Sequence, residues 1–344
     1  MLDNKIDIIS RDLAINQKKL EVKKFEYGCL IIKEANSWVE EAKNRPIPNM
    51  LFNEFWYENE VCILFSDTNL GKSILAVQIA DSISKGIQIP GFKLESQSKK
   101  VLYLDFELSD KQFENRCSQE YENHYKFNKN FLRAELHTEL ELPKEYKNIE
   151  EYLCSTLSNI IIETKASVII VDNLTFLSSE NEKAKDALVL MKTLKQISRT
   201  NNVSILVLAH TPKRDDTKPI SKNDLAGSKM LMNFCDSCFA IGSSSQESSL
   251  RYIKQIKQRN TEHLYNTNNV IICSLDKKSN FLEFHFENFD NEIDHLKSKD
   301  STSTEEKDAL VKLLVSEGLS NVKIAERLGV TEGAIRKRRI KLGI

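Results

Sequence analysis

The sequence predicts an α/β fold with a mostly parallel central sheet, followed by a small all-α module at its C-terminal end. Three observations support this prediction. Apolar strand-like runs alternate with helix-like periodic stretches from about residue 50 to residue 288, the pattern of a parallel sheet covered on both faces. A Gly-Lys-Ser tripeptide stands between one such strand and one such helix. A polar stretch then separates this region from a second periodic segment with apolar positions of its own.

Length and composition favour one large domain and one small one, in a protein of the cytoplasm. The chain has 344 residues, its hydrophobic content of 40% is enough for a buried core, and its net charge of −1 gives no global nucleic-acid signal. The sequence opens with no signal peptide, and no apolar run approaches the ~20 residues of a membrane span. We therefore expect reduced thiols, a cytoplasmic location and no membrane association.

The predicted elements follow one another along four segments. These are an N-terminal helical arm (1–45, with a helix at 30–43), a domain at 46–289, a linker at 290–304 and a helical module at 305–344. Within the domain, strands are predicted near 61–66, 101–106, 131–136, 167–172 and 203–209. Helices are predicted at 72–85, 109–122, 148–163 and 183–199. Later strands, which we expect to be antiparallel, are predicted near 236–242, 250–258, 268–274 and 280–286.

Two of the seven cysteines have CxxC spacing. A zinc site at Cys235 and Cys238 needs two more ligands, and no second pair or nearby His offers them. A redox pair would stand at the start of a helix, where the pKa of a thiol is lowered. We therefore interpret both residues as core cysteines, with a zinc or redox pair as the alternative.

The segment between the first apolar strand and the following helix has the layout of a phosphate-binding loop. It consists of Ser66, Asp67, Thr68, Asn69, Leu70, Gly71, Lys72, Ser73 and Ile74. The N–H groups at a helix N-terminus carry partial positive charge, Lys72 adds a full charge on the β- and γ-phosphates, and the Ser73 hydroxyl holds Mg²⁺. The segment therefore predicts that the chain binds and hydrolyses a nucleoside triphosphate, with ATP and Mg²⁺ as cofactors. A chance Gly-Lys-Ser in a buried connection is the alternative.

This loop departs from the usual motif at its start. Ser66 stands where the first glycine is expected, so Gly71 is the loop's only glycine. Backbone positions that need a positive φ must be met by other residues, and Asn69 tolerates the left-handed region best. Asp67 also brings a negative charge close to anionic phosphates.

Polar residues at the ends of three further strands complete the expected nucleotide site. Asp172 ends an apolar strand and is predicted to coordinate Mg²⁺, although many buried strands end in a structural Asp. Glu107, just past another strand, is the expected base that orients the attacking water; a solvated Glu that caps the next helix is the alternative, and Asp105 is the reserve candidate. His210 ends a fourth strand, where a polar residue can contact the γ-phosphate or serve only as a structural histidine.

The order of these motifs over residues 46–288 resembles the RecA-like P-loop ATPases, most closely the hexameric DnaB-type replicative helicases and the plasmid RepA-type helicases. Lys218–Ser228 looks like the DnaB-type segment after the sensor strand, and Lys257-Gln258-Arg259-Asn260 matches a Lys-x-Arg stretch of that family. The pattern also looks like the AAA-family ATPases of plasmids and integrative elements.

This resemblance implies a homo-oligomeric, hexameric ring that works on DNA. In the DnaB-type family the Lys and Arg reach the γ-phosphate of the neighbouring subunit, so the resemblance implies that Lys257 and Arg259 act in trans. The polar face of an amphipathic strand is the alternative. Besides Ser66, the chain departs from the family at Ala226, where a charged residue is common, and it lacks the large N-terminal domain of DnaB-type enzymes. The architecture is therefore closer to RepA-type or small mobile-element ATPases.

Two segments carry basic residues that suit DNA. Lys213 and Arg214 lie in a long polar loop after the His210 strand, which faces the central channel in a RecA-like ring; a plain solvated loop is the alternative. In the C-terminal module, the spacing of Ala325, Gly329 and Ile335 resembles the helix-turn-helix domains of resolvases and regulators. The DNA-binding residues expected on its last helix are Glu332, Arg336, Lys337, Arg338 and Arg339. A solvated basic tail is the alternative there.

Two functions fit these features. The first is a ring-forming, ATP-driven DNA helicase or replication protein of a plasmid or mobile element. The second is a DNA-binding regulator or mobilisation protein in which ATP only switches assembly. They differ in whether ATP hydrolysis moves a strand. A RecA-like recombinase is disfavoured because no filament-forming segment is visible.

Overall fold

The computed structural model of the chain describes residues 25–137, 139, 141–173, 183–212, 214–226, 228–297, 301–328, 330 and 332–344. The chain divides into two compact units, residues 1–49 and 50–344. In the first unit, strands β1 (Phe25–Tyr27) and β2 (Leu30–Ile32) form an antiparallel hairpin, and helix α2 (Ala35–Lys43) follows. The predicted helix at 30–43 is therefore too long at its start, because its first three residues pair with β1. Helix α2 buries no residue.

In the second unit, the described residues form a central sheet of nine strands. Their order is β15-β14-β13-β12-β5-β11-β10-β6-β9. The bounds are β5 (Val61–Ser66), β6 (Val101–Asp105), β9 (Phe131–Ala134), β10 (Val168–Asp172), β11 (Ser204–His210), β12 (Ser237–Ser243), β13 (Leu250–Lys257), β14 (Val270–Asp276) and β15 (Glu283–Asp290). Every pair from β12 to β9 is parallel, which confirms the mostly parallel sheet. The pairs β12–β13, β13–β14 and β14–β15 are antiparallel.

The first strand of the late group differs from the expectation. We predicted four antiparallel strands, but β12 runs parallel to β5. The reason is helix α7 (Ser228–Phe234), a short helix that the periodicity did not reveal and that lies between β11 and β12. A helical crossover returns the chain in the same direction, as parallel pairing requires.

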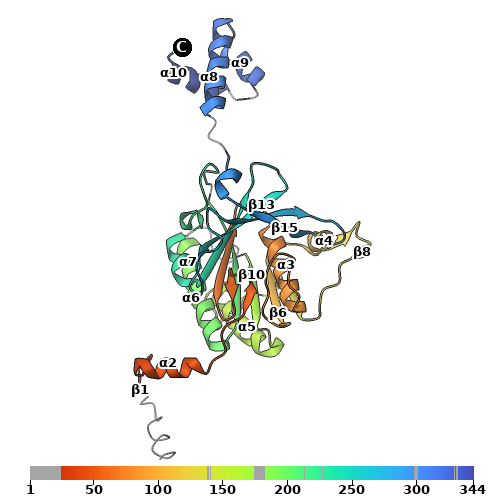
Figure 1. The fold of residues 1–344 in the computed structure, drawn as a ribbon, viewed down its shortest axis with the longest axis vertical. Helices are drawn as coiled ribbons and strands as arrows, with labels where there is room; N and C mark the ends of the chain where they lie inside the picture. Colours follow the sequence, from red (N-terminus) through yellow and green to blue (C-terminus); the bar gives the residue numbers. More distant parts are fainter. Residues whose placement is uncertain are drawn as a thin grey trace, which may run out of the picture. The chain divides into compact units, whose positions relative to one another are not determined.

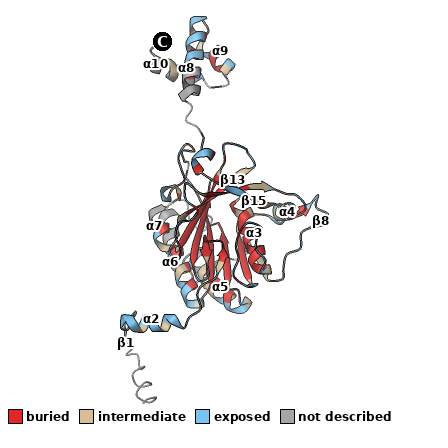
Figure 2. Cartoon of the chain, viewed as in Figure 1, coloured by how far each residue is buried: buried red, intermediate tan, exposed pale blue. Residues whose placement is uncertain are grey.

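Helices cover both faces of the sheet. Helix α3 (Lys72–Lys85) lies on one face, and α5 (Ile149–Thr164), α6 (Lys183–Asn201) and α7 lie on the other (Figure 1). Strand β5 shows why: Ile63 packs into the core on the α6 side and Leu64 into the core on the α3 side, since successive side chains of a strand point to opposite faces. Burying each such side chain contributes roughly 1.5–3 kcal/mol. Figure 2 shows the central strands as the buried part of the domain.

The smaller elements complete this unit. Strands β3 (Met50–Phe52) and β4 (Trp56–Tyr57) form a short hairpin. The helix predicted at 109–122 begins with the capping box of Ser109 but ends at Arg116, as α4 (Asp110–Arg116). Glu120 and Tyr121 both have a positive φ, which a helix cannot contain, and they lie between β7 (Ser118–Gln119) and β8 (Asn123–His124). The 3₁₀ helix η2 spans Lys222–Asp224.

The predicted linker at 290–304 is wrong at both ends. A 3₁₀ helix, η3 (Glu292–His295), buries Glu292 and His295, and helix α8 (Ser301–Ser316) begins four residues before the expected module. Helices α9 (Asn321–Leu328) and α10 (Glu332–Leu342) follow α8. The three helices pack around a small core of Val311, Leu314, Ile324, Ala325 and Ile335. Among the described residues, no helix is long and apolar enough to cross a membrane.

Candidate nucleotide site

Four neighbouring strands bring their polar ends to one edge of the sheet. Ser66 at the end of β5 pairs with His210 of β11, and Asp172 of β10 pairs with Asp105 of β6. Since the four strands are parallel and adjacent, these residues meet at the carboxyl edge, the edge at which β5 ends. Open α/β sheets bind their ligands at this edge. The structure therefore brings together the cis residues that we predicted from separate motifs.

The loop before α3 presents a helix N-terminus to this edge. Gly71 is the N-cap of α3, with a φ of +95°, and no side chain caps the helix. The first N–H groups of α3 are therefore suited to an anionic ligand. Asn69 has a φ of +63°, as its tolerance of the left-handed region predicts. Asp67 accepts a hydrogen bond from the Thr211 hydroxyl, which gives the unusual carboxylate of this loop a partner.

Two apolar side chains that sequence reasoning missed lie against Gly71. A Cβ at this position would meet the ring of Phe284 at 3.0 Å and a methyl group of Leu275 at 3.2 Å. The side-chain amide of Gln78, on α3, donates to the Phe284 carbonyl at 2.9 Å and accepts from the Phe284 N–H at 2.9 Å. The hairpin of β14 and β15 is thereby fastened to the helix. No local motif could have indicated a contact so distant along the chain.

The ammonium of Lys72 lies inside the site. Its Nζ donates to the Ser66 carbonyl at 3.2 Å and lies 3.1 Å from His210 Nδ1. An ammonium can only donate, so Nδ1 is the acceptor and a neutral His210 carries its proton on Nε2. Burial lowers the pKa of Lys72, although the nearby carboxylates of Asp172 and Glu107 oppose this. A phosphate at the helix N-terminus would replace these neutral partners with negative charge.

Glu107 completes a chain of polar contacts that starts at Lys72. His210 Nε2 lies 3.7 Å from Glu107 Oε1, and Asn173 Nδ2 donates to the same oxygen at 2.6 Å. These contacts, that of His210 first, hold the pKa of Glu107 below its usual range, so the carboxylate stays ionised. Asn173 is a site residue that we missed, because an Asn directly after the strand that ends in Asp172 carries no motif of its own.

Asp105 has a structural task that removes it as the reserve base. Its Oδ2 accepts from Arg133 Nε at 2.9 Å. Its Oδ1 accepts from the backbone N–H groups of Glu107 and Leu108, at 3.2 and 3.0 Å. Asp105 therefore shapes the turn that presents Glu107 at the carboxyl edge.

Asp172 and Ser73 form a pair that suits Mg²⁺. Burial raises the pKa of Asp172 to about 6, while hydrogen bonds from Tyr103 and Ser73 lower it. The Tyr103 hydroxyl donates to Asp172 Oδ2 at 2.5 Å. The described part of the chain holds no cluster of three or more His, Cys, Asp or Glu ligands. Mg²⁺ fits this arrangement, because it keeps several waters and binds through one or two protein groups plus phosphate oxygens.

Lys257 and Arg259 do not join this site. Lys257 Nζ donates to the Cys235 carbonyl at 2.7 Å, and Arg259 Nη1 lies 3.3 Å from Asp236 Oδ1. Asp236 is bonded through its own N–H to the carbonyl of Val61, the first residue of β5. Both cations therefore lie at the amino edge of the sheet, where β5 begins. The phosphate loop follows the other end of β5, about 16 Å away for five steps of ~3.3 Å.

Some of the expected DNA-binding residues are exposed, and others are engaged in contacts within the chain. Arg214 is wrong as a channel-facing cation, because its side chain is only 7% exposed and donates to the Lys218 carbonyl at 2.7 Å. Lys213 lies outside the described residues. On α10, Glu332, Arg336 and Lys337 are exposed, whereas Arg338 pairs with Asp308 and Arg339 donates to Asn321 at 2.8 Å. The last two residues therefore hold the three helices together.

Two other features lie away from this chemistry. Cys235 and Cys238 are buried, as the interpretation of core cysteines predicts. An apolar cavity of about 210 Å³ lies between the end of β9 and helix α5, and none of the predicted site residues lines it.

The chain resembles known proteins over the part that holds the nucleotide site. A family model described as an AAA domain matches residues 33–216, which is more than half of the chain. Among solved structures, it is similar to a KaiC-like protein from the hyperthermophilic archaeon Pyrococcus horikoshii OT3. The identity is 12%, the match covers 67% of this chain and 91% of that chain, and the TM-score is 0.45. Among curated proteins, none matches the sequence.

Proposed function

We propose that this chain, which belongs to the AAA domain family, is a RecA-like P-loop ATPase and an ATP-driven motor acting on DNA. Specifically, it is a ring-forming helicase or replication protein of a plasmid or mobile element. The observation that carries the proposal is the separation of two sets of residues. Lys72, His210 and Glu107 meet at the carboxyl edge of the sheet, and Arg259 lies at the opposite edge.

At the carboxyl edge, the chain's own groups bind and orient the nucleotide. The first turn of α3 and Lys72 hold the phosphates. Ser73 and Asp172 would hold Mg²⁺, which would supply positive charge to the bound triphosphate. Glu107 orients the attacking water and accepts its proton. His210 contacts both Lys72 and Glu107. When a γ-phosphate takes the place of His210 as the partner of Lys72, His210 passes this change on to Glu107.

Asn173 supports Glu107 in this scheme. Its amide donor lies 2.6 Å from Oε1 and stabilises the ionised form. A carboxylate held by two neighbours has fewer conformations to lose when water binds, and this preorganisation lowers the barrier to attack.

The position of Arg259 supports a ring. A guanidinium at the amino edge lies too far along β5 to reach the phosphates that its own chain binds. It is exposed by 53% and therefore open to a neighbour. In a head-to-tail ring, the amino edge of one subunit faces the carboxyl edge of the next, so Arg259 and Lys257 stabilise the charge on the neighbour's γ-phosphate.

The C-terminal helices supply a second DNA contact. Helices α8, α9 and α10 fold around a core of their own, which supports a separate helix-turn-helix domain after the ATPase domain. The exposed Arg336 and Lys337 lie on α10, the helix expected to meet DNA. This exposed basic face also favours the second candidate function, an ATP-switched DNA-binding regulator without unwinding activity.

ATP-dependent strand displacement from a forked DNA duplex tests the proposal. We expect the native chain to separate the strands and the Lys72→Ala variant to fail. Absence of displacement, together with intact ATP-dependent binding to duplex DNA, would replace the motor by the regulator. Size measurement with a non-hydrolysable ATP analogue tests the ring independently.

A further inference from the structure

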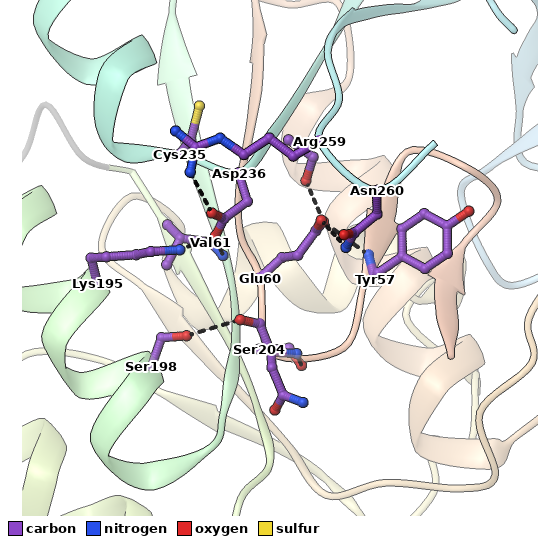
Figure 3. Close-up of polar contacts among 12 residues, drawn as sticks. Tyr57, Glu60, Val61, Lys195, Ser198, Ser204, Cys235, Asp236, Arg259 and Asn260 are labelled. Carbon is purple, nitrogen blue, oxygen red and sulfur yellow. Dashed lines mark hydrogen bonds and ion pairs between the residues drawn. The ribbon is translucent and has the colours of Figure 1, made fainter. Parts of the chain in front are cut away.

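Two carboxylates that the nucleotide chemistry does not use lie at the amino edge of the sheet. Glu60 immediately precedes β5, and Asp236 immediately precedes β12 (Figure 3). Both are surrounded by polar partners, and both contact the segment of Arg259 and Asn260 that follows β13. This segment carries the guanidinium that the proposed function assigns to a neighbour's nucleotide.

Asp236 is a fixed anchor for the guanidinium. Its Oδ2 accepts from the backbone N–H of Val61 at 3.0 Å and from the ammonium of Lys195, on α6. Its Oδ1 faces Arg259 Nη1 at 3.3 Å. Since Lys195 and Val61 already hold this carboxylate, Asp236 keeps its position and a compensating positive charge when Arg259 engages another anion.

Glu60 anchors the next residue of the same segment. Its Oε2 accepts from the Ser237 hydroxyl at 2.7 Å and from the Tyr57 N–H at 3.2 Å. Its Oε1 accepts from Asn260 Nδ2 at 2.7 Å. Glu60 itself is only 4% exposed, so its position is set by the core. Burial raises the pKa of Glu60 to about 7.

Gln258 fastens the segment from its other side. Its Nε2 donates to the Glu54 carbonyl at 2.7 Å, and its Oε1 accepts from the backbone N–H groups of Arg259 and Asn260, at 2.7 and 3.1 Å. The backbone that carries Arg259 is thus held by the side chains of its two neighbours, Gln258 and Asn260. Gln258 is bonded to Glu54, which precedes β4, and Asn260 is bonded to Glu60, which follows β4. A segment held in this way fixes the backbone from which the Arg259 side chain extends.

We propose that Asp236 is a positioning residue for Arg259 in the hydrolysis reaction, and that Glu60, acting through Asn260, positions the backbone that carries the guanidinium. This inference rests on the proposed trans action of Arg259. The guanidinium has five N–H donors, and the contact with Asp236 runs through Nη1. Within the described part of the chain, Asp236 is the ion-pair partner of this guanidinium, and 53% of the Arg259 side chain is exposed, so donors remain for a phosphate. Asp236 therefore orients the group instead of sequestering it.

A mixed-subunit ATPase assay with the full-length chain tests this proposal. Lys72→Ala subunits cannot use their own nucleotide but still offer Arg259; Arg259→Ala subunits bind nucleotide but offer no guanidinium. Mixing the two inactive variants restores hydrolysis if Arg259 acts in trans. No recovery in this mixture would refute the proposed function itself, before Asp236 is examined.

Asp236→Asn is then added as a second substitution to only one of the two variants at a time. Asp236→Asn in the Lys72→Ala subunit, which supplies the guanidinium, is expected to lower the recovered kcat on the order of tenfold while the KM for ATP stays constant. Asp236→Asn in the Arg259→Ala subunit is expected to leave the recovered rate in place, because that subunit offers no guanidinium to position. If Asp236 served only the stability of the fold, Asp236→Asn would lower the recovered rate equally in both mixtures. That result would overturn the proposal.

Asn260→Ala gives a second readout if Asp236→Asn impairs folding. It removes the link to Glu60 without touching Asp236, and we expect it to lower the recovered kcat only in the Lys72→Ala subunit. An unchanged rate for Asn260→Ala would refute the role of Glu60. An unchanged rate for a folded Asp236→Asn subunit would refute the role of Asp236.

Discussion

Replacing Asp172, the buried carboxylate proposed to hold Mg²⁺, is expected to stabilise the nucleotide-free protein while it abolishes magnesium-dependent binding. In Asp172→Asn, the amide oxygen can still accept from Tyr103 and Ser73, but the buried charge is gone. The pKa of Asp172 rises from 3.8 to about 6 on folding, chiefly through burial. At 1.36 kcal/mol for each pKa unit, the ionised carboxylate destabilises the fold by about 3 kcal/mol at neutral pH.

The pH dependence has a definite sign. A carboxyl whose pKa is higher in the folded state binds its proton more tightly there, so this group contributes most stability below pH 3.8 and loses that contribution as pH rises through about 6. We therefore expect the free energy of unfolding of Asp172→Asn to exceed that of the native chain at pH 7 by about 1–3 kcal/mol. The difference should shrink as pH falls from 6 to 4.

Urea unfolding between pH 4 and pH 8 measures this difference, and melting with and without Mg-ATP measures binding. Asp105→Asn is the matched control, since Asp105 pairs in register with Asp172 but holds Arg133. Removing its charge takes from the Arg133 guanidinium its buried carboxylate partner and leaves it only the exposed Asp110 and Glu135, so this variant should lose stability. Destabilisation of Asp172→Asn at pH 7, or an unchanged response to Mg-ATP, would refute the reasoning.

Three further substitutions test separate parts of the site. Asn173→Ala removes a hydrogen-bond donor to Glu107, so the pKa of Glu107 should rise. The acid limb of the pH–rate profile should therefore move to higher pH, and kcat should fall about tenfold. An acid limb at the same pH as in the native chain would contradict this. Gly71→Ala places a Cβ 3.0 Å from Phe284 at a φ of +95°. We expect this substitution to lower the melting temperature and to weaken ATP binding measured by calorimetry. ATP binding as tight as that of the native chain would contradict this and indicate that the β14–β15 hairpin moves to make room for the Cβ. Arg336→Ala should weaken DNA binding and reduce its salt slope by about one, and an unchanged slope would remove Arg336 from the contact.

The polar ends of the strands could be predicted from the sequence because each depends on a local pattern. An apolar run predicts a buried strand, and parallel neighbours necessarily align their carboxyl ends, so Ser66, Asp172 and His210 were expected together. Asn69 was expected in the left-handed region for an equally local reason, the short polar side chain that tolerates it.

Side-chain pairing could not be predicted in the same way. The sequence predicts Arg214 as a DNA-facing cation in a polar loop, with a plain solvated loop as the alternative, yet the fold buries its side chain against the Lys218 carbonyl. Likewise, half of the expected DNA-binding arginines serve the packing of the C-terminal helices, Arg338 through Asp308 and Arg339 through Asn321. Charge on a sequence does not say whether the partner is solvent, DNA or the same chain.

Local sequence pattern was enough to predict the phosphate loop, the strand ends and the class of fold, because backbone propensity and hydrophobic period act over a few residues. Only the folded chain shows that Asp105 shapes the turn leading to Glu107, and that Asn173 holds the Glu107 carboxylate. The same is true of Arg259, which lies at the opposite edge of the sheet from Lys72. These relations join residues far apart along the chain. They arise only when strand order and direction are set, and local pattern does not contain that information.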